Sequence, residues 1–287
     1  MLDKILNNRT IILYLLPISL GLLSVLSFQP FNFSFINFFI LPSFFFLIVY
    51  IKKKSKSTYR KKPYWKNLFL VGLLFGFGFY LSGIYWIAYS LTFDESFKFL
   101  IPIYIIFVPL FLGLFSGVTT LAIGNFLNYN LSSILLFSAS FALTDYIRGK
   151  ILTGFPWNLW GYSWSWFTEV LQILNLSGLF AFNLLAITVF TIPAVLFFKE
   201  NLSKKILVIS STFLFVFSIY IYGTFSINKN KGLINYLDNN KRIYTKVISP
   251  NFDLKYNSSI DEVENKLKKL IRYSDPDQKK ETLFIWP

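Results

Sequence analysis

The chain has 287 residues, of which 54% are hydrophobic and 21% aromatic, and its mean hydropathy is +0.53. Only 15% are charged, against about 25% in soluble domains, and apolar stretches long enough to cross a bilayer separate the charges, which indicates an integral membrane protein. The chain has no cysteine and no histidine, which excludes disulfides, Cys/His metal sites, a Ser-His-Asp triad and a Cys nucleophile within these residues.

Seven apolar segments along the chain have the length and composition of membrane-spanning helices. A polar stretch follows the last of them. We therefore expect a polytopic α-helical membrane domain of about seven transmembrane helices. The expected spans cover residues 10–27, 33–51, 67–91, 98–121, 131–148, 170–198 and 205–226.

The formal net charge of +14 would suggest nucleic acid in a soluble protein, but here the basic residues lie in short loops. The loop after the second span is strongly basic, whereas the loop after the third carries Asp94 and Glu95. This alternation predicts a cytoplasmic N-terminus and a periplasmic C-terminal part, with no nucleic-acid partner. The basic residues of the second loop are Lys52, Lys53, Lys54, Lys56, Arg60, Lys61, Lys62 and Lys66.

Four of the seven tryptophans lie between residues 149 and 167, on the expected outer face. One interpretation is an aromatic belt at the level of the lipid headgroups, where tryptophan is enriched. Another is the wall of a lipid-facing pocket in the outer leaflet, and the two are compatible. The four residues are Trp157, Trp160, Trp164 and Trp166.

Two glycine pairs, Gly72 with Gly76 and Gly113 with Gly117, have the four-residue spacing that permits close helix approach. We interpret them as packing positions. Neither a complete dinucleotide-binding glycine fingerprint nor a phosphate-cradling loop is present in the sequence, and we expect no cofactor and no metal site.

Asp145 and Arg148 are three residues apart near the outer end of the fifth span, so that they can pair on one helical face. Ionisable residues at membrane depth are candidates for function. The pair has two interpretations. It either anchors the tryptophan-rich segment or recognises a phospholipid headgroup through the guanidinium fork of Arg148.

The polar tail is typical of the start of an α/β unit. Residues 243–249 are strand-like, Ser258 or Ser259 can cap a helix with apolar residues on one face, and Leu283 to Trp286 form a second apolar strand. Strand, helix and strand in this spacing predict a parallel pair. Because two strands need further neighbours, we expect a domain that continues past Pro287. The expected divisions are a transmembrane domain at 1–226, a linker at 227–241 and an incomplete domain at 242–287.

Several segments resemble apolipoprotein N-acyltransferases, the membrane-bound members of the nitrilase superfamily. Thr153 to Trp157, followed by Gly161 to Ser163, resembles the family's TGFPW and GYS stretch. Asp145 to Gly149 is similar to its E-W-x-R-G stretch, with Asp where Glu is usual. Gln29 to Phe31 resembles its A-P-F signature, and Gly72 to Trp86 its glycine-rich third helix.

The resemblance continues through the sixth span and into the tail. Ser177 to Asn183 matches a G-x-x-G-x-S-F region loosely. Val247 to Asn251 resembles the V-Q-x-N strand that opens the nitrilase-like domain, and Phe284 to Pro287 the strand that ends in W-P-E. The resemblance covers the whole chain in the family's order. It implies that the tail is the truncated β-α-β start of a nitrilase-like, or carbon–nitrogen hydrolase, domain.

The resemblance implies acyl transfer from a phospholipid to the N-terminal amine of the diacylglyceryl-cysteine of an apolipoprotein, the last step of lipoprotein maturation. The catalytic Glu, Lys and Cys of the family would follow Pro287, so we expect this chain alone to be inactive. The resemblance further implies that the enzyme lies in the bacterial inner membrane and is a monomer. Its expected lipid-binding residues are Tyr85, Trp86, Asp145, Arg148, Phe155, Pro156 and Trp157.

Two other functions stay open on the residues alone. A transporter is disfavoured because the spans hold few polar residues and no convincing inverted repeat. A non-enzymatic membrane scaffold whose outer domain binds a partner is the third hypothesis.

Overall fold

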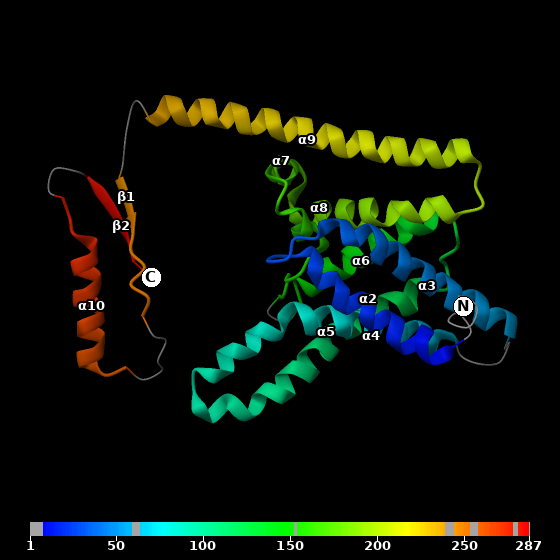
Figure 1. Cartoon of the computed structure of the whole chain (residues 1–287), viewed down its shortest axis with the longest axis horizontal. Helices are drawn as coiled ribbons and strands as arrows, with labels where there is room; N and C mark the ends of the chain where they lie inside the picture. Colours follow the sequence, from blue (N-terminus) through cyan, green and yellow to red (C-terminus); the bar gives the residue numbers. More distant parts are fainter. Residues whose placement is uncertain are drawn as a thin grey trace. The chain divides into compact units, whose positions relative to one another are not determined.

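The computed structural model describes residues 8–58, 64–151, 154–238, 244–252, 258–277 and 281–286. The protein is mostly helical with a small sheet (Figure 1). It forms two compact units, the first from residues 1–88 and 102–226 and the second from residues 89–101 and 227–287. The α-helices are α2 (Leu16–Ser24), α3 (Asn37–Thr58), α4 (Tyr64–Ile84), α5 (Ile101–Ile123), α6 (Leu131–Arg148), α7 (Thr168–Leu171), α8 (Leu174–Thr191), α9 (Leu202–Asp238) and α10 (Ile260–Ser274).

Short helical turns extend several of these helices. A π-helical turn, η1 (Ile11–Leu15), precedes α2. The others are the 3₁₀ segments η2 (Val25–Ser27), η3 (Ser34–Ile36), η4 (Tyr85–Thr92), η5 (Glu95–Leu100), η6 (Trp160–Trp164) and η7 (Ile192–Phe197). Asp94 caps η5, and its carboxylate accepts hydrogen bonds from the Ser96 hydroxyl and the Ser96 N–H, which lower the pKa of Asp94.

Among the described residues, five helical segments are long and apolar enough to cross a membrane. The first expected span is a shorter apolar helix, Ile11–Ser27, and the fifth corresponds to α6, which carries several hydroxyl side chains besides Asp145 and Arg148. The number of crossings, and with it the orientation, stays a prediction. The five segments are Ser34–Lys54, Tyr64–Thr92, Glu95–Ile123, Leu174–Phe197 and Leu202–Asn235.

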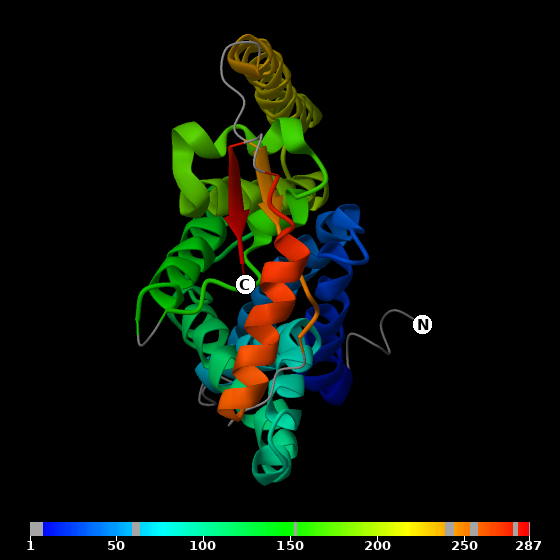
Figure 2. The same ribbon diagram turned by 90° about the vertical axis from the view of Figure 1, so that its left-hand side faces the viewer.

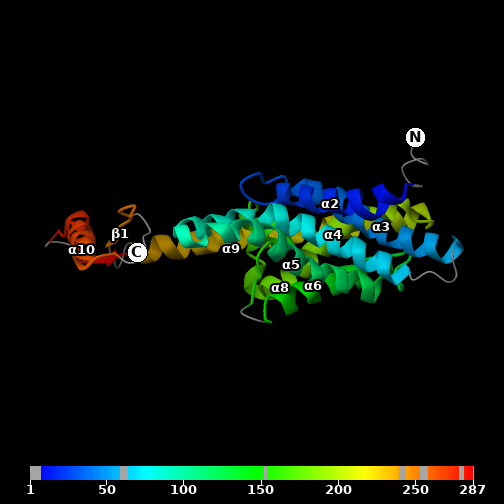
Figure 3. The ribbon, with the colours of Figure 1, turned by 90° about the horizontal axis from the view of Figure 1, so that it is seen from below.

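The first unit is a helical bundle in which α2 packs along α4, α6 packs along α8, and α3 contacts α2, α4 and α8 (Figure 3). Its core contains many packed aromatic rings among aliphatic side chains. Phe44 stacks on Phe75 with ring centroids 3.8 Å apart, and Phe137 meets Phe44 edge to face. Such ring pairs add to the dispersion energy that holds helices together in lipid, where the hydrophobic effect does not drive helix association.

The expected close approach of the glycine pairs is confirmed between α4 and α5. A Cβ on Gly76 would lie 2.8 Å from the Gly113 Cα, and one on Gly72 would lie 2.5 Å from the Ser116 carbonyl oxygen. The Thr120 hydroxyl, next to this contact, donates to the Leu68 carbonyl at 2.8 Å. The two helix backbones therefore touch, and an interhelical hydrogen bond joins them.

Lys52, in the basic loop sequence, is buried rather than solvated. Its ammonium donates to the Leu127 carbonyl at 2.7 Å and to Asn128 Oδ1 at 3.0 Å. It thereby joins the C-terminal part of α3 to the turn that follows α5. Residues 59–63 of the same loop lie outside the described part of the chain.

The second unit contains a strand–helix–strand motif. The strands β1 (Tyr244–Val247) and β2 (Thr282–Ile285) pair in parallel, with Tyr244 opposite Thr282 and Val247 opposite Ile285 (Figure 2). Ser259 and Glu262 form a capping box at the start of α10. The expected parallel β-α-β arrangement is thus present. Residues 227–238, expected as part of a linker, continue α9 as helix.

Candidate functional site

A buried polar cluster lies at the C-terminal end of α6. Arg148 is only 2% exposed, and its Nη2 donates to Asp145 Oδ1 at 3.0 Å. Its Nη1 donates a hydrogen bond to the Phe155 carbonyl. The Phe155 N–H in turn donates to the Arg148 carbonyl at 3.0 Å. The expected ion pair is therefore real, and both ends of the guanidinium fork are occupied within the protein.

Asn183 of α8 completes this cluster from the opposite side. Its Nδ2 donates to Asp145 Oδ2 at 2.8 Å, and its Oδ1 accepts from the Gly161 N–H at 3.0 Å. The side chain is fully buried. We call Asp145, Arg148 and Asn183 the clamp, because they hold both ends of the segment from Phe155 to Gly161, hereafter the clamped segment.

The clamped segment carries the exposed aromatic residues of the site. Trp157 is 45% exposed, and its ring lies 5.7 Å from that of Trp86, which is 50% exposed at the start of η4. Tyr85 and Pro156 are exposed as well, and Phe155 is half-buried beside Trp157. The structure therefore brings all seven residues expected to bind lipid into one region of the first unit.

The other three tryptophans between residues 149 and 167 differ in exposure, whereas a uniform interfacial belt would expose them all. Trp160 is buried and stacks on Phe79, with centroids 4.9 Å apart and planes 5° apart. Trp164 is half-buried against Phe190, and only Trp166 is exposed like Trp157. The belt interpretation is wrong for Trp160, because its ring packs in the core of the bundle, two residues after Asn158, which has a positive φ.

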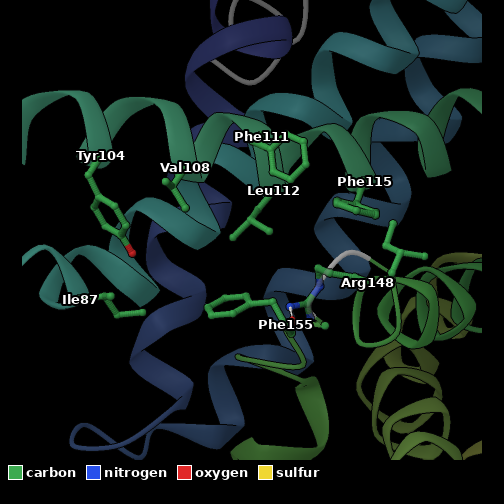
Figure 4. Close-up of a pocket in the computed structure, with 10 residues that line it drawn as sticks. Ile87, Tyr104, Val108, Phe111, Leu112, Phe115, Arg148 and Phe155 are labelled. Atoms are coloured by element: carbon green, nitrogen blue, oxygen red, sulfur yellow. Dashed lines mark hydrogen bonds between the residues drawn. The ribbon is translucent and has the colours of Figure 1, made fainter. Parts of the chain in front are cut away.

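An apolar cavity of about 290 Å³ adjoins the clamp (Figure 4). One wall comes from α5, and Arg148 and Phe155 lie across from it. The residues that line the cavity are Ile87, Tyr104, Val108, Phe111, Leu112, Phe115, Arg148, Ile151, Gly154 and Phe155.

Two tyrosines lie within the field of Arg148. The face of the Tyr80 ring is 5.3 Å from Arg148 Cζ, within cation–π range. Burial raises the pKa of the Tyr162 phenol, and the positive charge of Arg148 offsets part of that rise. The guanidinium of Arg148 thus interacts with a carboxylate, a carbonyl and the face of the Tyr80 ring.

The arrangement is suited to binding and positioning. The described residues contain no group of three Asp, Glu, His or Cys side chains that could hold a metal ion. The clamp consists of a carboxylate, a guanidinium and an amide, and none of its three side chains carries a hydroxyl or thiol nucleophile. What the geometry provides is an aromatic-bearing segment that is hydrogen-bonded at both ends and lies beside an apolar cavity.

The sequence had indicated Asp145, Arg148 and the tryptophan motif, but not Asn183 as their partner or α5 as a wall. The available signal for Asn183 is a lone amide within the apolar run from Leu179 to Ile187, where polar side chains need partners. The α5 residues that line the cavity carry no such signal, because they are ordinary membrane-helix residues.

Asn183→Ala is expected to lower the free energy of unfolding by about 1–3 kcal/mol, because Asp145 Oδ2 and the Gly161 N–H both lose a buried partner. Thermal unfolding of the detergent-solubilised protein measures this. Asn175→Ala, at an exposed position of the same helix, is the matched control and should change stability by less than about 0.5 kcal/mol. Equal effects of the two changes would mean that the clamp does not stabilise the bundle.

Comparison with known proteins places this region in a family. The model of the apolipoprotein N-acyltransferase N-terminal domain matches residues 20–192, which include the whole clamp and the clamped segment. The apolipoprotein N-acyltransferase of Rickettsia typhi is 32% identical over 213 residues, covering 74% of this chain and 40% of the relative. That of Rickettsia prowazekii is 33% identical over 215 residues, with the same coverage.

A third relative, the apolipoprotein N-acyltransferase of Brucella melitensis, is 37% identical over 127 residues, 44% of this chain. The chain spans about two fifths of the length of the two rickettsial relatives. The matched region accounts for more than half of the chain, and it holds every expected lipid-binding residue. The chain belongs to the apolipoprotein N-acyltransferase family, whose N-terminal domain it contains.

Proposed function

We propose that the chain is the membrane part of an enzyme that transfers an acyl chain from a phospholipid to the N-terminal amine of a diacylglyceryl-cysteine on a lipoprotein. The single observation that carries this proposal is the clamp. It holds both ends of the segment that carries Phe155 and Trp157, beside an apolar cavity and next to the exposed Trp86. Both substrates are lipids, and a substrate route from the bilayer requires such an aromatic, apolar entrance.

In this proposal Tyr85, Trp86, Phe155, Pro156 and Trp157 contact lipid. Asp145 and Arg148, together with Asn183, act as positioning residues that keep the clamped segment in place. The site lies on the periplasmic face of the inner membrane, with the N-terminus in the cytoplasm. The alternation of basic and acidic loops supports this orientation.

The catalytic steps belong to sequence beyond Pro287, in a nitrilase-like domain of which the β-α-β motif is the start. A glutamate would take the proton of a cysteine thiol, and the thiolate would attack an ester carbonyl of the phospholipid. A thioester forms and the lysophospholipid leaves as an alcohol, while a lysine stabilises the oxyanion. The lipoprotein amine then attacks the thioester, forming the amide and releasing the thiol.

The proposal is tested by complementation of bacteria depleted of their own N-acyltransferase. The complete reading frame that contains this chain is expected to restore triacylated lipoprotein, whereas residues 1–287 alone are not. Mass spectrometry of the lipoprotein N-terminus reads the result. Failure of the complete frame, or rescue by residues 1–287, would contradict the proposal.

The same assay tests the site. Trp157→Ala in the complete protein is expected to lower the acylation rate about tenfold or more, because it removes the exposed ring that the clamp positions. Trp166→Ala is the matched control, since Trp166 has similar exposure but lies outside the clamped segment. Equal losses in the two variants would assign both tryptophans to a general interfacial role.

A further inference from the structure

We propose that the end of the bundle opposite the clamp binds an anionic phospholipid at a site made of two lysines and four aromatic rings. This site, hereafter the lysine–aromatic site, takes its residues from α3, from the turn between α5 and α6, and from the end of η7. Lipid binding there is separate from the acyl transfer proposed above and does not depend on it. The residues of the site are Phe46, Lys53, Tyr129, Phe197, Phe198 and Lys199.

The aromatic rings of the site come from three segments that are distant in sequence. The ring of Phe46 lies 5.8 Å from that of Tyr129 and 5.6 Å from that of Phe197, measured between centroids. Phe198 is buried, and its ring lies 6.4 Å from that of Tyr129. The four rings therefore form one packed cluster at this end of the bundle.

Two exposed lysines lie at this cluster. Lys53 Nζ is 3.8 Å from the centroid of the Tyr129 ring, within cation–π range, and Lys199 directly follows the buried Phe198. The described residues give neither lysine a carboxylate partner. Because a ring face occupies only one side of an ammonium, N–H donors remain for the oxygens of a phosphate.

The charge around the site is strongly positive. Within the described residues of the first unit the carboxylates are Asp145 in the clamp, Glu169 in α7, and Glu200, which lies 3.9 Å from Lys204. Only Glu200 is at the end of the unit where α3 ends and α9 begins (Figures 1 and 3). A basic cluster next to membrane helices is typical of anionic lipid binding. The basic residues at this end are Lys52, Lys53, Lys54, Lys66, Lys199, Lys204 and Lys205.

An exposed ring indicates a lipid rather than a free anion as the occupant. Phe197 is 75% exposed and is the last residue of the candidate span Leu174–Phe197, so in a membrane its ring meets acyl chains. Lys199 follows it by two positions and presents a positive charge. An occupant that contacts both residues needs hydrocarbon next to a negative charge, which an anionic phospholipid has.

The lysine–aromatic site and the clamp lie at opposite ends of α6. Tyr129 precedes the first residue of this helix, Leu131, and Arg148 is its last residue. The 18 residues of α6 span about 27 Å, close to the roughly 30 Å of a bilayer's hydrocarbon core. The bound lipid therefore belongs to the leaflet opposite the one at the clamp, and it is not the acyl donor.

Native mass spectrometry of the detergent-purified full chain measures the dissociation constants of phosphatidylglycerol and phosphatidylethanolamine with identical acyl chains. We expect phosphatidylglycerol to bind about tenfold more tightly. It should also raise the unfolding temperature more, since a ligand of the folded state stabilises it. Lys53→Gln together with Lys199→Gln should reduce the preference to less than about twofold. Equal affinities of the two lipids for the wild-type chain would overturn the proposal.

Lys150→Gln is the matched control. Lys150 is also exposed and faces a tyrosine ring, that of Tyr146, but it lies at the clamp end of α6. This variant should keep the wild-type preference, and so should Lys53→Arg, which keeps the charge. A loss in Lys150→Gln as large as in the double variant would show that only the net charge attracts the lipid, and the site would be wrong.

A competition experiment separates a lipid from a free anion. Glycerophosphoglycerol, the same headgroup without acyl chains, is expected to leave phosphatidylglycerol bound even at about a hundredfold excess, because it makes no contact with Phe197. Phe197→Ala should weaken phosphatidylglycerol binding about fivefold for the same reason. Displacement by glycerophosphoglycerol, or an unchanged affinity in Phe197→Ala, would contradict the assignment to a lipid.

Discussion

Asp145→Ala is expected to destabilise the helical bundle by about 3–5 kcal/mol, the cost of leaving a buried charge without its partner. Arg148 is 2% exposed, so bulk solvent does not reach its guanidinium to replace the carboxylate. Asn183 Nδ2 loses its acceptor in the same change. Thermal unfolding of the purified protein in detergent, followed by tryptophan fluorescence, measures the shift.

The second substitution Arg148→Met, made together with Asp145→Ala, is the control. It removes the unpaired charge and fills the space with an apolar chain, so much of the lost stability should return. The acylation rate should stay low, because the Phe155 carbonyl is no longer held. A single Asp145→Ala variant as stable as the wild type would show that the ion pair is not needed in the bundle.

Gly72→Ala is expected to lower stability by about 1–3 kcal/mol, the usual cost of forcing a methyl group into a filled contact. The new Cβ would lie 2.0 Å from Thr120 Oγ1 and 2.5 Å from the Ser116 carbonyl oxygen. Relief requires α4 and α5 to separate, which also weakens the Thr120 to Leu68 hydrogen bond. The same detergent unfolding measurement applies.

Gly232→Ala on α9 is the matched control, since no atom lies within 4 Å of its added Cβ. Alanine favours a helix over glycine by about 1 kcal/mol, so this variant should be unchanged or slightly more stable. If Gly72→Ala behaves like Gly232→Ala, the glycine pairs are not packing positions.

Features that depend on local pattern could be predicted from the sequence. The spacing of Gly72, Gly76, Gly113 and Gly117 implies close helix approach, and the structure has it between α4 and α5. The tail's strand, capped helix and strand follow from residue alternation and cap chemistry, and the pair is parallel as expected. The three-residue spacing of Asp145 and Arg148 likewise predicts the ion pair that the structure has.

Features that depend on how distant segments of the chain come together could not be predicted from the sequence. Whether Trp160 faces lipid or the core is decided by the backbone at Asn158 and by the stacking partner Phe79, which is about 80 positions away. Asn183 reaches Asp145 across 38 positions, and α5 contributes its cavity wall only after the bundle has formed. Spacing along one segment carries no information about such contacts.

The orientation of the clamped segment is the claim on which the proposed function depends most directly. The chain has no cysteine, so residues 1–287 with Trp166→Cys or Lys53→Cys carry one thiol each, both at exposed positions. In intact spheroplasts a membrane-impermeant maleimide is expected to label the cysteine at 166 and to reach the one at 53 only after permeabilisation. The reverse pattern would contradict the account, because it would place the clamped segment in the cytoplasm.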